Sequence, residues 1–172
     1  MLGNLTLAHI RQGEVDAAVH ALDAASATYN NTAHGRIPNF KGSDQAAEQL
    51  ATLPAWKAAT AIKAVPDKAQ LPVRARALEE GKTVYMAVPK LATPRPFYPL
   101  DSATLTVPPA EAAYSRVAAT VAPTVDVDGL RPIQVVVLGS VAVNRDGVRI
   151  GEGAGYSDLE FALLAETGLI SP

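Results

Sequence analysis

One segment near the C-terminus holds the residues whose types and spacing could do chemistry. Residues 148–150 form a short strand-like run that leads into Gly151-Glu152-Gly153-Ala154-Gly155. Ser157, with Glu160 three residues later, has the spacing of a capping box and predicts a helix that begins at Asp158. Glycines let backbone amides approach a ligand closely, and a helix N-terminus carries partial positive charge. This order of strand, glycine loop and helix therefore favours binding of a phosphate group.

The glycine pattern alone does not identify a ligand. The dinucleotide-binding fingerprint has its third glycine one residue later than Gly155, and a P-loop requires a lysine followed by serine or threonine. A tight turn that binds nothing would show the same three glycines. Both interpretations stay open at the level of this pattern.

Composition excludes several other kinds of site. The 172 residues contain no cysteine, which excludes disulfides, thiolate metal sites and cysteine nucleophiles. The three histidines, His9, His20 and His34, are widely spaced, so a histidine-rich zinc site is not expected. The net charge of −2 argues against a nucleic-acid partner, and no apolar run is long enough to span a membrane.

The charges are unevenly distributed along the chain. Residues 36–76 hold seven basic and three acidic side chains, whereas residues 101–172 hold four basic and nine acidic ones. Two interpretations of the basic block stay open: it faces a small polyanion such as a nucleotide phosphate, or it is ordinary solvated surface. Arg74 and Arg76 lie in this block two residues apart, so on a helix at most one of them is expected to point at a ligand.

Apolar periodicity predicts an α/β fold with a mostly parallel sheet. The spacing of Val15, Ala18, Val19 and Leu22 indicates an amphipathic helix over residues 14–28. Helical and strand-like segments then alternate, as is typical of a parallel sheet. Helices are expected from Ser43, which would cap the first of them, and over 73–80 and 109–121, with strands over 59–65, 83–88 and 133–138. The last of these strands is almost entirely apolar and is expected to be central and buried on both faces.

Four further expectations concern residues between or beside these elements. The proline-rich residues 89–109 are expected to be mostly irregular. Lys90 follows the predicted strand 83–88, and ligands of open parallel sheets bind at the carboxyl ends of strands, so Lys90 is a candidate ligand-binding residue. Trp56 is expected to pack against apolar neighbours rather than to stack on a ligand. Residues 144–147 have the composition of a turn between two short strands.

The glycine-containing segment resembles a known family. It is similar to the signature of the 5-formyltetrahydrofolate cyclo-ligases, also called methenyltetrahydrofolate synthetases, at Gly139, Val141, Ala142, Gly147, Arg149, Gly151, Gly153, Gly155, Tyr156 and Asp158. Four stretches are similar to the divergent branch of methenyltetrahydrofolate synthetase domain-containing proteins: HGRIPNFKGSDQAAEQL, DKAQLPVR, EEGKTVYMAVPKL and GEGAGYSDLE. Together the similar stretches cover most of residues 34–167.

The resemblance implies a fold and a domain organisation. The family's fold is a Rossmann-like α/β fold, a mostly parallel sheet sandwiched by helices, related to ribose-phosphate isomerases and CoA transferases. A cyclo-ligase-like domain is expected over residues 34–172, preceded by an N-terminal helical arm over residues 1–33. Because family members carry further strands after the helix that begins at Asp158, we expect a trimmed C-terminus or a fold completed by another chain. A homo-oligomer that buries residues 163–170 is the expected form of completion.

The resemblance also implies an ATP- and Mg²⁺-dependent ligase of one-carbon metabolism in the cytoplasm. In that reaction the formyl oxygen on N5 of 5-formyltetrahydrofolate attacks the γ-phosphate of ATP. N10 then closes the ring and phosphate leaves, which gives 5,10-methenyltetrahydrofolate. Arg149 and Asp158 would be catalytic, and Asp158 would bind Mg²⁺. The side chains of Arg149 and Asp158 and the backbone amides of the glycine loop would project into one cleft. The nucleotide would be bound by Gly151, Gly153, Ala154, Gly155 and Tyr156, together with Lys90.

The chain departs from the family's pattern inside the signature. Asn144 stands where active cyclo-ligases have aspartate, and Ala154 stands in place of the loop lysine. Ser157 and Leu159 replace a tyrosine and an arginine. Two hypotheses therefore stay open: a cyclo-ligase that binds a nucleotide and a reduced folate, and a non-catalytic nucleotide- or folate-binding regulatory module of the same fold. A third, an acyl- or sugar-phosphate enzyme, would need a carboxylate nucleophile at a strand end, and the sequence shows no convincing one.

Overall fold

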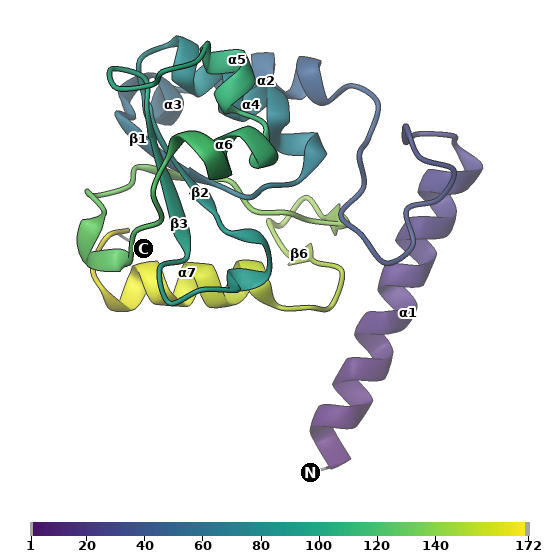
Figure 1. Cartoon of the computed structure of the whole chain (residues 1–172). Helices are drawn as coiled ribbons and strands as arrows, with labels where there is room; N and C mark the ends of the chain where they lie inside the picture. The colour runs from purple at the N-terminus through teal and green to yellow at the C-terminus, as the bar shows by residue number, and fades with distance from the viewer. Residues whose placement is uncertain (1, 171–172) are drawn as a thin grey trace. The chain divides into compact units, whose positions relative to one another are not determined.

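The computed structural model describes the backbone of residues 2–170 and the side chains of residues 13–170. The chain divides into two units, each built from two separate stretches of sequence (Figure 1). The first unit contains the residues up to Lys41 together with Gly139–Gly155, and the second contains Gly42–Leu138 together with the residues from Tyr156 onward. The predicted boundary between an arm over residues 1–33 and a domain over residues 34–172 stays a prediction.

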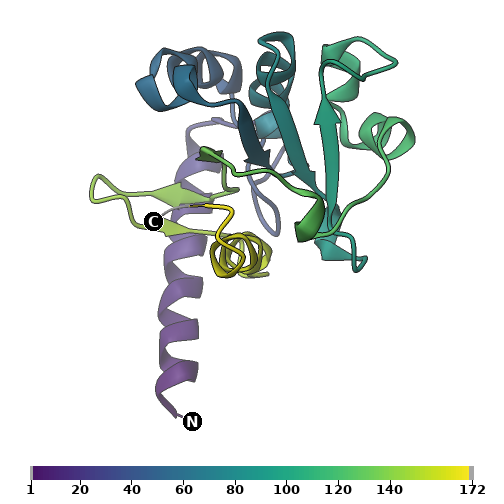
Figure 2. The same ribbon diagram turned by 90° about the vertical axis from the view of Figure 1, so that its left-hand side faces the viewer.

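A four-stranded sheet forms the centre of the second unit (Figure 2). Its strands lie in the order β3-β2-β1-β4, where β1 pairs in parallel with both β2 and β4, and β3 pairs antiparallel with β2. The strands are β1 (Ala61–Ala64), β2 (Thr83–Ala87), β3 (Phe97–Asp101) and β4 (Val135–Val136). The predicted α/β class with a mostly parallel sheet is therefore confirmed.

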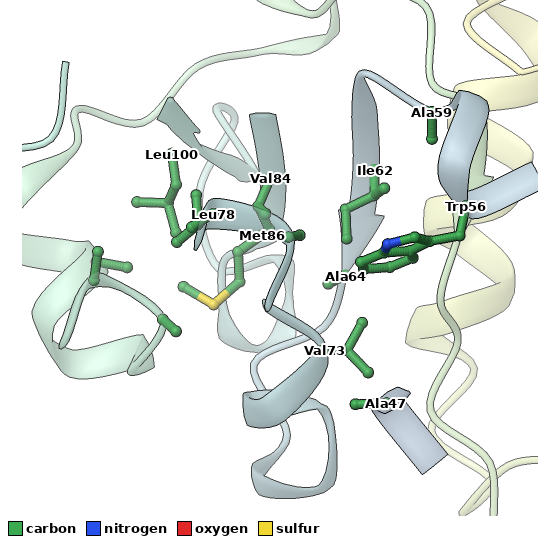
Figure 3. Packing of buried hydrophobic residues seen from close by; sticks show 14 of the residues in the cluster. Ala47, Trp56, Ala59, Ile62, Ala64, Val73, Leu78, Val84, Met86 and Leu100 are labelled. Atoms are coloured by element: carbon green, nitrogen blue, oxygen red, sulfur yellow. The ribbon is translucent and has the colours of Figure 1, made fainter. Parts of the chain in front are cut away.

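Helices cover both faces of this sheet (Figure 1). One face carries Ile62, Val84 and Met86 and packs against residues of five helices; Figure 3 shows the buried Trp56 in this layer. The opposite face carries Tyr85 and packs against Leu164 of α7. The helices are α2 (Ser43–Thr52), α3 (Pro54–Ala58), α4 (Leu71–Glu79), α5 (Pro109–Ala112), α6 (Ser115–Val121) and α7 (Tyr156–Glu166), with 3₁₀ turns at Lys68–Gln70, Pro89–Leu91 and Val127–Gly129.

The first unit combines a long helix with a hairpin. Helix α1 (Leu2–Ala24) packs the predicted stripe of Val15, Ala18, Val19 and Leu22 against Ala33 and Val141, so the predicted amphipathic helix is confirmed. The helix ends earlier than predicted because Ser26 adopts the left-handed conformation, with Ser26 N donating to Asp23 O and Ala27 N donating to Leu22 O, which is a Schellman motif. Strands β5 (Ala142–Val143) and β6 (Arg149–Ile150) form the antiparallel hairpin.

Three predictions about the elements were wrong. Residues 133–138 form a short edge strand, β4, whose valines are half-buried, and not a central strand. The helix expected over residues 109–121 is interrupted at Tyr114, which has extended backbone angles and separates α5 from α6. Residues 89–109 are mostly irregular, as predicted, but they also contain strand β3, in which Pro99 is tolerated because β3 lies at the sheet edge and needs no donor on its outer side. The predicted cap at Ser43 is also replaced, since Gly42 is the N-cap residue of α2.

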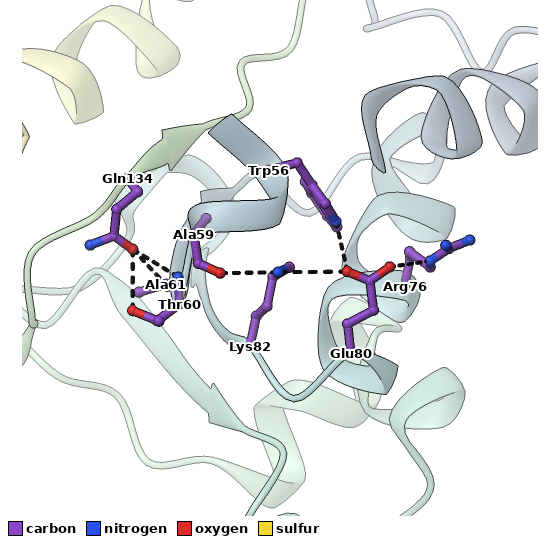
Figure 4. A network of polar contacts seen from close by, with 8 residues as sticks. All are labelled: Trp56, Ala59, Thr60, Ala61, Arg76, Glu80, Lys82 and Gln134. Atoms are coloured by element: carbon purple, nitrogen blue, oxygen red, sulfur yellow. Dashed lines mark hydrogen bonds and ion pairs between the residues drawn. The ribbon is translucent and has the colours of Figure 1, made fainter. Parts of the chain in front are cut away.

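A polar cluster ties the amino end of the sheet to the helices (Figure 4). The carboxylate of Glu80 accepts a hydrogen bond from Trp56 Nε1 at 2.7 Å and another from Arg76 Nε. Lys82 Nζ lies 3.6 Å from the same carboxylate and donates to the carbonyl of Ala59 at 3.0 Å. These contacts join the end of α4, the end of α3 and the start of β2.

The pKa of Glu80 provides a test of this cluster. Partial burial raises the pKa, but the hydrogen bonds from Arg76 and Trp56 and the nearby positive charges outweigh it, so the pKa lies below the ordinary value of 4.5. A depressed carboxyl pKa contributes stability that is present above pH 4.5 and is lost as the pH falls through the folded-state pKa. We expect Glu80→Gln to lower the free energy of unfolding at neutral pH and to lower it by less at an acidic pH below 4.5. Urea unfolding followed by fluorescence of Trp56, the single tryptophan, measures the free energy of unfolding at both pH values. The exposed neighbour Glu79→Gln is the control, and an equal loss at both pH values would contradict the assignment.

Candidate functional site

The carboxyl ends of the parallel strands present two different loops. After β2, Lys90 lies in the turn Pro89–Leu91 with an exposed side chain, so its predicted position behind a parallel strand is confirmed. Lys90 and Leu91 both have positive φ, 61° and 48°, a conformation that is uncommon for residues other than glycine.

The loop after β1 is held by a buried arginine. Arg74 Nη1 donates to the carbonyls of Val65 and Asp67, and Arg74 Nε donates to the carbonyl of Ala113 at 2.9 Å. Burial lowers the pKa of Arg74 to about 10, which leaves the side chain charged at neutral pH. Arg74 is therefore a structural residue, while Arg76 pairs with Glu80 on the surface. Because Lys63 is buried as well, two of the seven basic side chains in residues 36–76 are withdrawn from the surface.

The glycine loop follows the β5–β6 hairpin in the first unit. Gly153 and Gly155 have φ values of 101° and 74°, which other residues rarely adopt. Among the described residues, no hydrogen bond uses a backbone amide of residues 152–155, and these four residues are exposed. Arg149 Nη1 donates to the carbonyl of Gly139 at 3.2 Å, so this side chain returns toward the base of the hairpin. The loop thus presents backbone donors of the kind that bind phosphate oxygens.

Asn144 has a local role in the same hairpin. Its Oδ1 accepts hydrogen bonds from the amides of Asp146 and Val148 at 3.0 and 2.9 Å. The predicted turn over residues 144–147 is confirmed, with Gly147 at φ 82°. An aspartate carboxylate could accept the same two bonds, so the turn itself does not require asparagine.

Helix α7 starts directly after the glycine loop and places the next predicted residues. Tyr156 and Ser157 are half-buried, and Asp158 is exposed in the first helical turn, where a negative charge is stabilised by the helix dipole. The predicted capping box was wrong, because Glu160 does not return to the helix start. Its carboxylate lies in the core and forms an ion pair with Lys63.

The structure groups the predicted site residues into two sets. Arg149, Gly151, Gly153, Ala154 and Gly155 belong to the first unit, and they are consecutive or nearly so along the chain. Lys90, Tyr156 and Asp158 belong to the second unit. The prediction that Arg149 and Asp158 share one cleft with the loop amides stays a prediction.

Sequence reasoning missed Lys63 and Glu160 as a pair. Lys63 is the one charged residue in the predicted strand 59–65, and this isolated charge was a signal that a counter-charge must lie opposite. Glu160 had a competing local explanation as a capping residue, and nothing in the sequence shows that a residue 97 positions away approaches Lys63.

The described part of the chain contains neither a metal-binding cluster nor a helix that could span a membrane. Across residues 13–170, no group of three or more His, Asp or Glu side chains is arranged to hold a metal ion. In the same part of the chain, no helix combines the length and the apolar character needed to cross a bilayer.

Comparison with known proteins identifies the family. The model of the 5-formyltetrahydrofolate cyclo-ligase family matches residues 18–170. The chain belongs to the 5-formyltetrahydrofolate cyclo-ligase family. This confirms the resemblance and, together with the helix-flanked parallel sheet, the fold that it implied.

Curated relatives show which members of the family the chain is similar to. A methenyltetrahydrofolate synthase domain-containing protein of Bos taurus is 38% identical over 147 residues, which cover 84% of this chain and 38% of that protein. The corresponding proteins of Mus musculus and Homo sapiens are 38% identical over 146 residues and 34% identical over 147 residues, with 39% and 38% of their lengths covered. The chain therefore spans less than half the length of these relatives.

The glycine loop gives a prediction about backbone strain. At Gly153 an added Cβ would meet open space, but the φ of 101° is unfavourable for any L side chain. We expect Gly153→Ala to lower the free energy of unfolding by roughly 1–2 kcal/mol. Gly151 has no positive φ, and an added Cβ would lie 3.5 Å from Arg149 Nη1, an ordinary contact, so Gly151→Ala should change stability little. Urea unfolding followed by circular dichroism compares the two, and equal effects would show that the loop does not require its left-handed glycine.

Proposed function

We propose that the chain binds Mg-ATP and a reduced folate and converts 5-formyltetrahydrofolate to 5,10-methenyltetrahydrofolate. Family membership supports a cyclo-ligase-like, folate-related function. The observation that carries the nucleotide part is the exposed glycine loop, whose backbone amides at residues 152–155 lead directly into helix α7. Backbone amides followed by a helix N-terminus are a frequent arrangement for binding phosphate.

The proposal assigns roles to individual residues. The loop formed by Gly151, Gly153, Ala154 and Gly155 binds phosphate oxygens through its amides, and Tyr156 packs beside the nucleotide. Asp158 binds the Mg²⁺ carried by ATP, and Arg149 neutralises charge that develops on the transferred phosphoryl group. Lys90 contacts the ligand from the carboxyl end of β2. Catalysis of this type depends mainly on positioning and on charge stabilisation, which these groups can supply.

The second candidate function is a non-catalytic module that binds a nucleotide or a folate and regulates another activity. Ala154 favours it, since a lysine at this place in the loop would supply a positive charge to the phosphates. Asn144 favours it less strongly, because the structure gives this residue a role in the hairpin turn. The retained Arg149 and Asp158 favour the enzyme.

One assay distinguishes the two functions. The protein is incubated with 5-formyltetrahydrofolate, ATP and Mg²⁺, and formation of the methenyl chromophore is followed by absorbance. The enzyme predicts turnover, and Asp158→Asn should reduce it on the order of a hundredfold with little change in stability. The module predicts no turnover, with a thermal shift on addition of Mg-ATP that weakens in Asp158→Asn. The absence of turnover, together with the absence of a thermal shift with both millimolar Mg-ATP and 5-formyltetrahydrofolate, would remove both candidates.

We further propose that the protein acts in the cytoplasm and forms a homo-oligomer. The predicted surface at residues 163–170 needs revision, because Leu164 and Ile170 are buried within the second unit. The large apolar side chains of α7 that are exposed are Leu159 and Phe161, at 58% and 43%. If this surface joins two copies, light scattering should give twice the chain mass, and Phe161→Ser should shift the protein to monomers. A monomeric parent protein at high concentration would contradict this proposal.

A further inference from the structure

A buried ion pair connects the sheet of the second unit to helix α7. Lys63 on β1 and Glu160 on α7 have side chains that are 0% and 4% exposed. Lys63 lies in register with Tyr85 on β2 and Val136 on β4, so its ammonium group leaves the sheet on the face that α7 covers. This pair has no role in the reaction proposed above.

Few residues of α7 are fully buried. Only two of its eleven residues are, Glu160 and Leu164, which lie one turn apart on the same face of the helix. Displacing an apolar side chain such as Leu164 costs packing energy, because the displaced side chain no longer fills its place in the core. Displacing a buried ion pair costs more, since it leaves an uncompensated buried charge.

The residues around Glu160 make a shift of α7 especially unfavourable. A displacement of one residue would place Leu159 or Phe161 opposite the ammonium group of Lys63, and a displacement of one turn would place Leu164 or Tyr156 there. None of these side chains carries a negative charge to pair with Lys63. The arrangement therefore favours one register of α7 on the sheet.

We propose that Lys63 and Glu160 are positioning residues that fix helix α7 so that Tyr156 and Asp158 at its start can contact the ligand. This inference rests on the proposed function, because Tyr156 and Asp158 are its nucleotide and Mg²⁺ residues. Glu160 lies four and two residues after them on the same rigid helix, so a rotation at Glu160 is transmitted to both. Neither Lys63 nor Glu160 touches the reacting groups.

The test replaces the charged pair by an apolar one. Replacing a buried ion pair by apolar residues of similar volume often leaves stability unchanged or raises it. In Lys63→Met/Glu160→Leu we therefore expect a urea midpoint equal to or above that of the parent protein. We also expect α7 amides at residues 160–166 to exchange hydrogen at least tenfold faster relative to β1 and β2, and Mg-ATP to bind at least tenfold more weakly. The matched control is Ile62→Val, next to Lys63 but on the opposite face of the sheet, which should lower stability without selective exchange in α7.

The outcomes separate this inference from the proposed function. A stable double variant with unchanged α7 exchange and unchanged Mg-ATP affinity would overturn the inference. If the parent protein binds no Mg-ATP, the proposed function fails, and hydrogen exchange in the absence of ligand still decides whether the pair holds α7. If the double variant does not fold, Glu160→Gln serves in its place, because it keeps the shape of the side chain and removes its charge. Parent-like exchange of α7 in Glu160→Gln would likewise overturn the inference.

Discussion

A parallel sheet must be covered on both faces, and this requirement governs the second unit. On one face, residues of five helices pack around Ile62, Val84 and Met86. On the other face, α7 is the main cover, with the segment that precedes β4 at its side. Because two buried side chains anchor α7, the geometry of the chain immediately after the glycine loop depends on a small number of contacts. The same contacts that cover this face of the sheet therefore also determine the position of Asp158 on α7.

Patterns that depend on near neighbours in the sequence predicted much of the fold. The stripe from Val15 to Leu22 gave the correct helix face, and the apolar runs gave β1 and β2, because periodicity reflects burial directly. The errors came from distant partners. The run ending at Leu138 resembles a central strand, yet nothing in it reveals that only β1 pairs with it. Strand β3 was not predicted because it contains Pro99. The partner of Glu160 was not predicted because the spacing of Glu160 from Ser157 suggested a local capping role.

The candidate site shows the same division between local and distant information. The glycine loop, the hairpin turn and the placement of Lys90 behind β2 follow from short sequence patterns. The role of Arg74 does not, because its three backbone acceptors include Ala113, which lies 39 positions away. A basic residue in a block of positive charge looks like a ligand for phosphate until its surroundings are known. Burial therefore decides which arginines of this chain remain available to an anion.

The interleaving of the two units has a consequence for synthesis on the ribosome. Each unit is completed by a late stretch of chain, residues 139–155 for the first and the residues from Tyr156 onward for the second. The apolar stripe of α1 is therefore synthesised about 120 residues before Val141, against which it packs. The parallel sheet likewise has one face uncovered until α7 is synthesised. While this part of the chain emerges, both apolar surfaces stay exposed until the residues after 139 follow, and exposed apolar surface of this kind favours aggregation of a nascent chain.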